Sequence, residues 1–442
     1  MPTGTAVEHD VEDKLYRKIA WRIVPFLFAC YVVSVIDRLN IGFAKLQFMT
    51  DLGLSDIEYG WIAGVFFVGY VICEVPSNWL LIRMGARRTL FRIMFLWGLA
   101  GTLMAFAQGA ATLTTLRFLL GAAEAGFFPG VVFLLSSWFP DKRRGRIMGL
   151  FVAAIPVAGM IGGPLSGMLL HHFDGVLGLR GWQWLFLIEG PPAMLLGVLC
   201  LMVLTDSPKE ASWLNDAERR KLTDDLSEGT RGGHTAASDG IKAAFTDLRV
   251  YLLALVYCTI PFFNGVNLWI PTILKDGIGA SLVQIGWLSA AMSLGTAFVI
   301  ILFGRSSDYF MERQWHLVAL GLISLVSYAT LPLVSGSLTP TVVLLGIGSA
   351  CGYAALGVFW TLPPAILGAS RSALGIAVIS SIGQLGGFAS PIVVGWLKTI
   401  TGSLYFAISV PAAVLLLGMA LLLFSTRLTS SVSSDAPQAT HS

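Results

Sequence analysis

Two pairs of charged residues stand inside apolar stretches of the sequence, where charges are rare. Arg117 and Glu124 are seven residues apart in the run 116–129, and Asp37 and Arg38 are neighbours in an earlier run. Seven residues are close to two helical turns, so Arg117 and Glu124 project from one face of a helix. They are too far apart there for a direct short contact, so each needs another partner. We therefore expect Asp37 and Arg38 to complete a set of four charges.

These four side chains are suited to coupling the binding of protons to the binding of a carboxylate. The planar fork of an arginine matches the two oxygens of a carboxylate. While both acids are ionised they neutralise the arginines, and once protonated they free the arginines to bind an anion. Asp37 and Glu124 are thus predicted to couple protons. Arg38 and Arg117 are predicted to bind the substrate, with Arg38 as the direct contact and Arg117 partly holding the acids. The alternative is a structural ion pair that locks two helices together.

The composition indicates a helical membrane protein. Of 442 residues, 55% are hydrophobic and 12% are charged, whereas soluble proteins carry about 25% charged residues. The mean hydropathy is +0.75. The first residues are polar and of mixed charge, so they do not form a secretory signal peptide. The five cysteines lie in apolar runs, which argues against a disulfide framework, and the net charge of +3 does not point to nucleic acid.

Twelve segments are long and apolar enough to cross a bilayer as helices. They cover residues 21–45, 58–82, 88–108, 112–138, 146–170, 182–204, 249–272, 282–304, 316–335, 340–367, 373–397 and 403–426. We expect an all-α polytopic membrane protein of two six-helix bundles, with these parts: 1–204 as the N-terminal bundle, 205–248 as a cytoplasmic loop, 249–427 as the C-terminal bundle and 428–442 as a disordered cytoplasmic tail.

The basic residues predict the orientation of the chain in the membrane. Most of the 29 Lys and Arg residues fall in the N-terminus, in the loops after spans 2, 4, 6, 8 and 10, and in the tail. Cytoplasmic loops carry an excess of Lys and Arg. Both termini are therefore predicted to be cytoplasmic, in a multi-pass protein of a bacterial inner membrane.

Several motifs together resemble the anion:cation symporter family of the major facilitator superfamily. They are Asp-Arg-Leu-Asn-Ile-Gly-Phe-Ala at 37–44, Glu-Val-Pro-Ser-Asn at 74–78, the run 117–129, Trp-Phe-Pro at 138–140, the run 181–190 and Gly-Gly-Phe at 386–388. The chain departs from the family at Ile82, where an aspartate is usual, although Asp308 stands at the matching place after span 8. Ser380 and Gln384 stand where relatives often carry asparagines.

The resemblance implies a major facilitator fold with a central cavity between its halves, and transport by alternating access. It implies that Asp37 and Glu124 handle protons while Arg38 and Arg117 serve the substrate or its charge balance. The coupling ion is then the proton, with no cofactor. We expect a monomer whose partners are a small organic anion and the lipid bilayer.

Other polar and aromatic residues in the spans are weaker candidates. Those expected to bind substrate are Tyr70, Asn264, Asn267, Trp360 and Gln384. The alternative for each is core packing or an interhelical hydrogen bond. Those expected to have structural or gating roles are Glu74, Asn78, Glu189 and Asp308. The sequence contains no P-loop, metal cluster or nucleophile triad that would indicate an enzyme.

The favoured function is a proton-coupled importer of an organic carboxylate. The substrate ranked first is a small hydroxy-dicarboxylate such as tartrate, or a sugar acid. An aromatic acid of the hydroxyphenylacetate or phthalate type is second. An exchanger or uniporter is left open, because the motifs do not set the stoichiometry. A membrane receptor for an organic acid is the alternative from another class, which the short polar segments disfavour.

Overall fold

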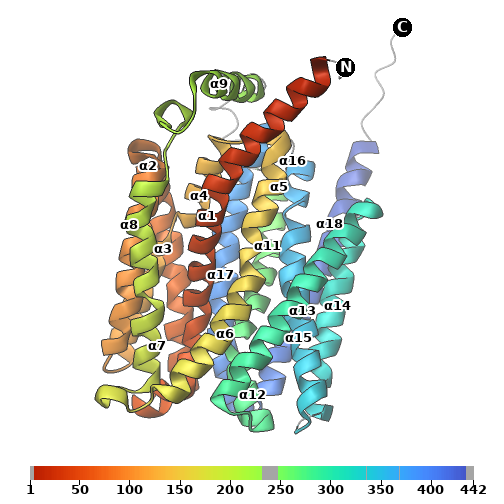
Figure 1. Cartoon of the computed structure of the whole chain (residues 1–442). Coiled ribbons are helices and arrows are strands. Elements are labelled where there is room, and N and C mark those ends of the chain that lie inside the picture. Colours follow the sequence, from red (N-terminus) through yellow and green to blue (C-terminus); the bar gives the residue numbers. More distant parts are fainter. Residues whose placement is uncertain (1–3, 231–246, 335, 368, 435–442) are drawn as a thin grey trace. The chain divides into compact units, whose positions relative to one another are not determined.

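The computed structural model describes residues 4–230, 247–334, 336–367 and 369–434, and it is built of helices (Figure 1). In the first half the elements are α1 (Gly4–Asp51), α2 (Asp56–Leu103), η1 (Met104–Phe106), α3 (Ala110–Glu124), α4 (Phe127–Ser136), α5 (Asp141–Val152), α6 (Ala154–His172), η2 (Val176–Gly178), α7 (Gly181–Glu189), α8 (Pro191–Val203), η3 (Pro208–Glu210) and α9 (Asp216–Thr230). In the second half they are α11 (Leu248–Asn264), η4 (Gly265–Trp269), α12 (Ile270–Ile278), α13 (Leu282–Tyr309), α14 (Gln314–Thr330), η5 (Leu331–Val334), α15 (Leu338–Phe359), α16 (Leu362–Leu367), α17 (Ala369–Thr401) and α18 (Leu404–Ser434).

The predicted membrane helices are present. In the described part of the chain, 11 helical segments are long and apolar enough to span a membrane. One of them, Asp56–Phe106, has 51 residues. At 1.5 Å per residue it is roughly 76 Å long, more than twice the thickness of the hydrocarbon core. It therefore holds two spans, so each of the twelve predicted spans has a counterpart among these segments, with ends that differ by up to nine residues.

The long helix α2 breaks at Gly85, which has φ 80° and ψ 166°. That backbone conformation favours glycine. The carboxylate of Asp206, from the segment after α8, accepts a hydrogen bond of 2.7 Å from the backbone N–H of Arg87. It occupies the space that a Cβ at Gly85 would need, with its Cγ only 2.7 Å from that position. Asp206 thus caps the helical stretch that starts after the break.

The chain divides into two compact units. The first unit comprises Met1–Ser55, Val65–Thr235 and Ser281–Ala290. The second unit comprises Asp56–Gly64, Ala236–Ala280 and Ala291–Ser442. Within the predicted loop 205–248, residues 216–230 form α9, while 231–246 lie outside the described residues. Helix α18 extends to Ser434, and 435–442 of the predicted tail also lie outside them.

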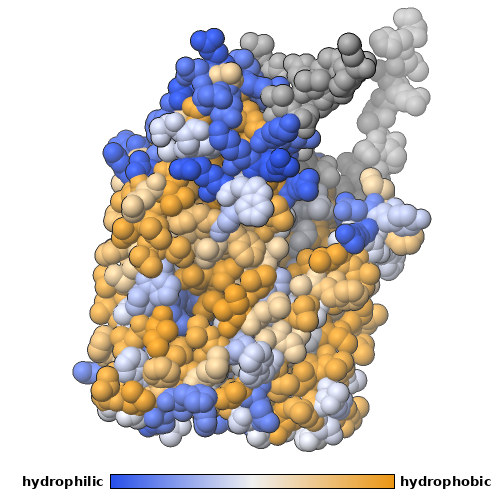
Figure 2. Space-filling view, viewed as in Figure 1, coloured by the Kyte–Doolittle hydropathy of each residue, from blue (hydrophilic) through white to orange (hydrophobic). Residues whose placement is uncertain are grey.

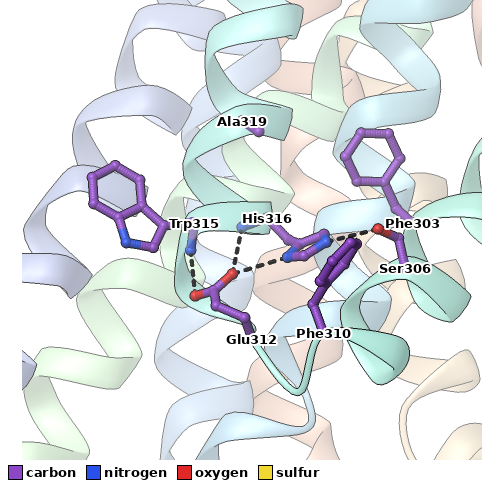
Figure 3. Close-up of a pocket in the computed structure, with 7 residues that line it drawn as sticks. All are labelled: Phe303, Ser306, Phe310, Glu312, Trp315, His316 and Ala319. Atoms are coloured by element: carbon purple, nitrogen blue, oxygen red, sulfur yellow. Dashed lines mark hydrogen bonds and ion pairs between the residues drawn. The ribbon is translucent and has the colours of Figure 1, made fainter.

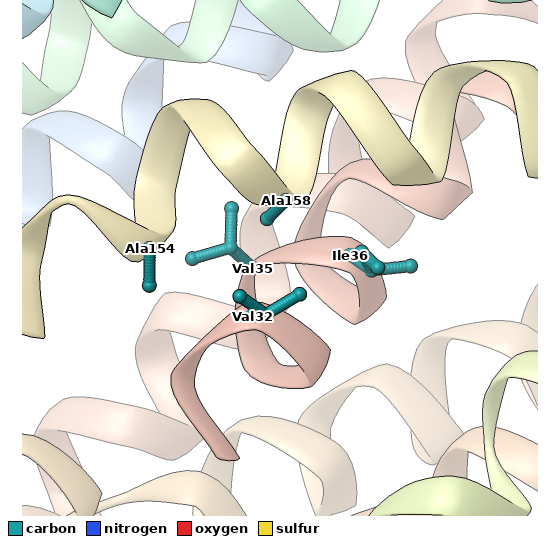
Figure 4. Packing of buried hydrophobic residues seen from close by; sticks show 5 residues of the cluster. All are labelled: Val32, Val35, Ile36, Ala154 and Ala158. Carbon is teal, nitrogen blue, oxygen red and sulfur yellow. The ribbon is translucent and has the colours of Figure 1, made fainter. Parts of the chain in front are cut away.

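In the first unit, α1 packs against α5, α6, α7 and α8. Its contact with α6 joins Val32, Val35 and Ile36 to two alanines, Ala154 and Ala158 (Figure 4). Small residues on one helix let the branched side chains of the other approach its backbone. This packing fixes the rotation of α1 just before Asp37 and Arg38.

In the second unit, α11 packs against α15, α17 and α18, and α14 packs against α15 and α18. Glycines make the closest approaches. A Cβ at Gly386 of α17 would overlap the carbonyl oxygen of Cys258 on α11, and one at Gly418 of α18 would lie 2.6 Å from the Thr259 methyl carbon. Gly386, in the Gly-Gly-Phe motif at 386–388, therefore lies against a neighbouring backbone.

Hydrophobic side chains cover much of the helix surface, whereas hydrophilic ones gather around α9 and the part of α1 beside it (Figure 2). At that polar end, Tyr16 donates a hydrogen bond of 2.9 Å to Asp225, and Lys18 lies 2.8 Å from Glu218. Exposed apolar residues such as Phe298 and Leu417 would meet water in a soluble protein. On membrane-spanning helices they meet lipid instead.

Candidate functional site

The stretch with Arg117 and Glu124 is broken directly after the glutamate. The predicted span over 112–138 is present as the segment Ala110–Ser136, but within it α3 ends at Glu124 and α4 begins at Phe127. The break is at Gly126, which has φ 89°. A Cβ at Gly121, between the two charged residues, would overlap the Phe66 carbonyl oxygen of α2. Glycines at these positions allow α3 to bend and to touch the backbone of α2.

Glu124 pairs with Arg38 of α1. The Glu124 side chain is 0% exposed, and its Oε1 accepts hydrogen bonds from Arg38 Nε at 2.9 Å and from Ser34 Oγ at 2.6 Å. Arg38 Nη2 also lies 2.8 Å from Oε1. The second oxygen, Oε2, makes no hydrogen bond within the described residues. Arg38 and Glu124 thus join α1 to α3.

Arg38 is the accessible member of this ion pair. Its side chain is 34% exposed. Its Cζ lies 5.5 Å from the centre of the Phe66 ring and 5.7 Å from that of Tyr70. Both distances are in the range of cation–π attraction. An anion that reaches Arg38 would meet a guanidinium beside two aromatic rings, while Glu124 is shielded behind it.

Asp37 faces another direction and is buried, with 2% of its surface exposed. The indole N–H of Trp97 donates to Asp37 Oδ2, and Asn40 Nδ2 donates to Oδ1 at 3.2 Å. Arg117 is also buried and interacts electrostatically with Asp37. Adjacent helical residues are about 100° apart, which explains why Asp37 and Arg38 face different neighbours.

The first unit therefore brings together five of the predicted site residues: Asp37, Arg38, Tyr70, Arg117 and Glu124. Phe66 links the two cations, because the Arg117 Cζ lies 5.0 Å from the same ring that Arg38 approaches. Four neighbours were missed by sequence reasoning, namely Ser34, Asn40, Phe66 and Trp97. Two of them could have been found from their spacing. Ser34 lies four residues before Arg38, and Asn40 lies three residues after Asp37, so each shares a helix face with its charged partner. Trp97 carried no such signal.

The residues expected to be structural or gating lie in several places. Glu74 is buried and Asn78 is half-buried, both in the first half of α2. Glu189, the last residue of α7, is buried and accepts a hydrogen bond of 2.8 Å from Ser166 Oγ. Asp308 is exposed near the end of α13 and pairs with Arg313 at 2.6 Å. Their predicted roles remain predictions.

The second unit holds the remaining candidates in a neutral setting. Asn267 Nδ2 donates to the carbonyl oxygen of Asn264 at 2.9 Å, and Ser349 Oγ donates to Asn267 Oδ1. Trp360 packs on Tyr257 with ring centres 4.7 Å apart. Gln384 is half-buried on α17. Among the described residues of α11 to α18, the buried polar side chains are Ser and Thr, and none is Asp, Glu, Lys or Arg.

A surface pocket of about 540 Å³ lies where α13 turns into α14 (Figure 3). His316 lies 3.0 Å from Ser306 Oγ and 2.9 Å from Glu312 Oε2, a hydrogen-bonded row of serine, histidine and acid. Ser306 lies within helix α13, whose backbone N–H groups are used by the helix itself. Glu312 also accepts from the N–H of Trp315 at 2.7 Å, as a helix cap does. The row holds the turn between α13 and α14 together.

Comparisons with known proteins agree with this architecture. The sequence profile of the Major Facilitator Superfamily matches residues 27–283. A "Putative tartrate transporter" of Agrobacterium vitis is 41% identical over 427 residues, covering 95% of this chain and 93% of its own length. The "Inner membrane transport protein RhmT" of Escherichia coli (strain K12) is 36% identical over 429 residues, covering 95% of this chain and 97% of its own.

A crystal structure shows the same fold. It is that of a bacterial homolog of the human lysosomal transporter Spinster, with a TM-score of 0.74 at 19% identity, covering 93% of this chain and 97% of that one. Family and fold together identify a multi-pass membrane transporter, which is not an enzyme. The chain belongs to the major facilitator superfamily.

Proposed function

We propose that this transporter imports an organic carboxylate together with protons, by alternating access. The observation that carries the proposal is the Arg38–Glu124 pair, in which the cation is 34% exposed and the acid is 0% exposed. A substrate carboxylate can approach the arginine, whereas the acid is shielded from it. A proton, being small, can still reach the acid.

Protonation of Glu124 would release Arg38 for the substrate. The ionised carboxylate holds the guanidinium through Nε and Nη2. A neutral carboxyl attracts a guanidinium far less, because charge-assisted hydrogen bonds are roughly twice as strong as neutral ones. The substrate carboxylate then takes the place of Glu124 on the arginine fork. Loss of the proton on the other side of the membrane would restore the internal pair and expel the substrate.

Charge balance supports a substrate with two carboxylates. With Asp37 and Glu124 ionised, the four-charge set of Asp37, Arg38, Arg117 and Glu124 is neutral. With both acids protonated it carries two positive charges, which match a dianion. A small hydroxy-dicarboxylate such as tartrate fits this balance, and the name of the Agrobacterium vitis relative points to the same class. A sugar acid remains within the proposal, with one carboxylate on Arg38.

An aromatic acid is the second candidate substrate. The observation in its favour is the pair of rings, Phe66 and Tyr70, beside the Arg38 guanidinium. An aromatic carboxylate bound there would place its ring against two others, an arrangement worth about 0.5–1.5 kcal/mol per ring pair beyond burial. Comparing uptake of tartrate with that of hydroxyphenylacetate distinguishes the two classes.

We further propose that the chain lies in the inner membrane with both termini in the cytoplasm. The support is the distribution of Lys and Arg along the sequence and the inner-membrane relative from Escherichia coli. Reporter fusions to the C-terminus test the orientation. One reporter should be active only in the cytoplasm and the other only outside it.

The central test is uptake into proteoliposomes under an imposed pH gradient. Wild type should accumulate the acid and move protons with it. Asp37→Asn and Glu124→Gln should abolish gradient-driven accumulation but retain counterflow, in which labelled and unlabelled substrate exchange. Asp174→Asn is the matched control, because Asp174 is also an acid paired with an arginine, Arg180 at 2.9 Å, but outside the spans.

Two results would count against this function. Substrate uptake without substrate-dependent proton movement would indicate a uniporter or an exchanger. Substrate binding without any flux would favour a receptor. Gradient-driven uptake that persists in both acid variants would remove Asp37 and Glu124 from the coupling step.

A further inference from the structure

A third acid, Glu189, is buried in the first unit outside the four-charge set. It is 3% exposed at the end of α7. One oxygen accepts a hydrogen bond of 2.8 Å from Ser166 Oγ, and the other, Oε2, makes no hydrogen bond within the described residues. An ionised carboxylate buried among neutral groups is poorly compensated, because burial of a charge needs a countercharge or several donors.

Glu189 is linked to Asp37 through Asn40. Asn40 Nδ2 donates to Asp37 Oδ1 at 3.2 Å, and its side chain also interacts with Glu189. The charges of Asp37 and Glu189 act on one another directly. Two nearby carboxylates disfavour simultaneous ionisation, so the proton occupancy of one depends on the other.

The neighbours of this pair come from four elements. Around Glu189, α1 supplies Asp37 and Asn40, and α6 supplies the Ser166 hydroxyl. Around Asp37, α2 supplies Trp97, and α3 supplies Arg117 and Glu124. The cation therefore acts on Asp37, while Glu189 faces neutral groups and a like charge.

Glu189 also lies nearer to one end of the bundle than Asp37. The end of α1 meets the start of α7, where Asp51 lies 2.8 Å from Arg180 and accepts a hydrogen bond of 2.8 Å from Trp182. At 1.5 Å per residue, Glu189 is roughly 12 Å along its helix from that end, and Asp37 is roughly 21 Å along α1. This end is the one predicted to be external.

We propose that Glu189 is a third proton-binding residue of the transporter, coupled to Asp37 through Asn40, so that ionisation of one acid holds the proton on the other. It acts as a positioning residue: it sets when Asp37 gains or loses its proton and does not contact the substrate. The proposal rests on the proposed function for its role in coupling, but not for the proton binding itself.

Infrared titration of the full-length protein in lipid tests this directly. Protonated buried carboxyls give C=O stretching bands whose intensity follows pH. Glu189→Gln should remove one titrating band and move the midpoint of the Asp37 band, identified with Asp37→Asn, to lower pH by about one unit or more. Glu312→Gln, at the α13–α14 turn, is the control and should leave the Asp37 midpoint unchanged.

A second variant keeps the test decisive if Glu189→Gln folds poorly. Ser166→Ala removes the hydroxyl that donates to Glu189 Oε1. Because this hydrogen bond stabilises the ionised carboxylate, its loss should move the Glu189 band to higher pH. If Glu189 had only a structural role, Glu189→Gln would remove no titrating band and Ser166→Ala would shift none. Either of these results would overturn the proposal.

The titration uses neither substrate nor gradient, so the two proposals can fail separately. Absence of substrate-dependent proton flux in wild type would overturn the symport mechanism and leave the band shifts as predicted. Intact symport with unshifted bands would overturn the role of Glu189 alone. In the transport assay, Glu189→Gln should move the pH midpoint of gradient-driven uptake in the same direction as the Asp37 band.

Discussion

The two halves of the chain share their packing but differ in their chemistry. The first unit buries charged side chains, among them Asp37, Arg117, Glu124 and Glu189, whereas the buried polar side chains described in α11 to α18 are Ser and Thr. Glycine contacts occur in both: Gly121 lies against the Phe66 carbonyl oxygen, and Gly386 against that of Cys258. The helical scaffold is thus repeated, while the buried Asp, Glu and Arg side chains just named belong to the first unit.

This difference suggests a division of labour. Charges in a membrane are costly, about 2.5–3.5 kcal/mol at the centre of a helix, so they are retained where they act. In the proposed mechanism the acids of the first unit bind protons, so this unit would change its charge with pH. The neutral amides and hydroxyls of the second unit can offer hydrogen bonds to a substrate's hydroxyls without responding to pH.

The largest effect should come from breaking the Arg38–Glu124 pair. Arg38→Met leaves Glu124 buried and unpaired, and loss of one partner of a buried pair costs about 3–5 kcal/mol. The double variant Arg38→Met/Glu124→Gln should recover most of this loss, because no buried charge is left alone. Thermal unfolding in detergent measures both. A double variant as unstable as the single one would show that Glu124 is compensated by another group.

Glycine replacements test whether the packing really is equal in the two halves. Gly121→Ala and Gly386→Ala each place a methyl on a neighbouring carbonyl oxygen, and overpacking of this kind costs about 1–3 kcal/mol. Their losses of unfolding free energy should be similar. Gly149→Ala and Gly357→Ala are matched controls, since a Cβ at either meets nothing within 4 Å. A loss confined to one half would contradict a shared scaffold.

In the neutral half the polar contacts should matter less for stability. Ser349→Ala removes the donor to Asn267 Oδ1, and a typical hydrogen bond contributes about 0.5–1.5 kcal/mol. Uptake should weaken through substrate affinity, and the pH dependence of uptake should stay as in wild type. Initial rates across substrate concentration and pH measure both. A shifted pH dependence would mean that the second unit also takes part in proton coupling.

The smallest effects should come from acids outside the spans, where the halves behave alike. The backbone N–H of Gly181 and the Arg180 guanidinium lower the pKa of Asp174. For Glu312, burial raises the pKa, but the backbone N–H of Trp315 and the His316 side chain outweigh it and lower the pKa overall. Lowered pKa values stabilise the folded protein above the unfolded-state pKa of about 4.

This stabilisation is lost as the pH falls through the lowered pKa values of Asp174 and Glu312 in the folded state. Asp174→Asn and Glu312→Gln should each reduce the free energy of unfolding at pH 7 by less than about 1 kcal/mol. The difference from wild type should shrink below about pH 4, where the wild-type acids become protonated. Melting temperatures at pH 7 and pH 3.5 provide the measurement. If the difference in melting temperature between variant and wild type were larger at pH 3.5 than at pH 7, the pKa shifts would have the opposite sign.

The sequence was sufficient for the spans and for the identity of the charged set. Hydropathy over about 20 residues is a strong signal because lipid-facing helices need it. Asp37, Arg38, Arg117 and Glu124 stood out because charges are rare in apolar runs. The pairing was beyond the sequence, since it depends on how α1 is rotated against α3.

Other features depended on contacts between distant segments. The break at Gly126 splits a run that reads as one apolar span. Trp97 is one of 13 tryptophans, and only its position opposite Asp37 distinguishes it. Glu189 was expected to have a structural or gating role, and its link to Asp37 through Asn40 of another helix was not predicted. Such contacts are set by tertiary packing, which single-sequence patterns do not encode.

The attachment of α9 to α1 offers a practical handle on this transporter. Beyond the Tyr16–Asp225 and Lys18–Glu218 contacts, Trp213 stacks on Trp138 with ring centres 5.4 Å apart and lies 5.0 Å from the Arg22 guanidinium. These noncovalent contacts hold α9 on the first unit. A fluorophore on α9, for instance at the exposed Thr223, would therefore move with that unit. Spectroscopic distances measured from it to labels in the second unit would follow the transport cycle without touching a buried charge.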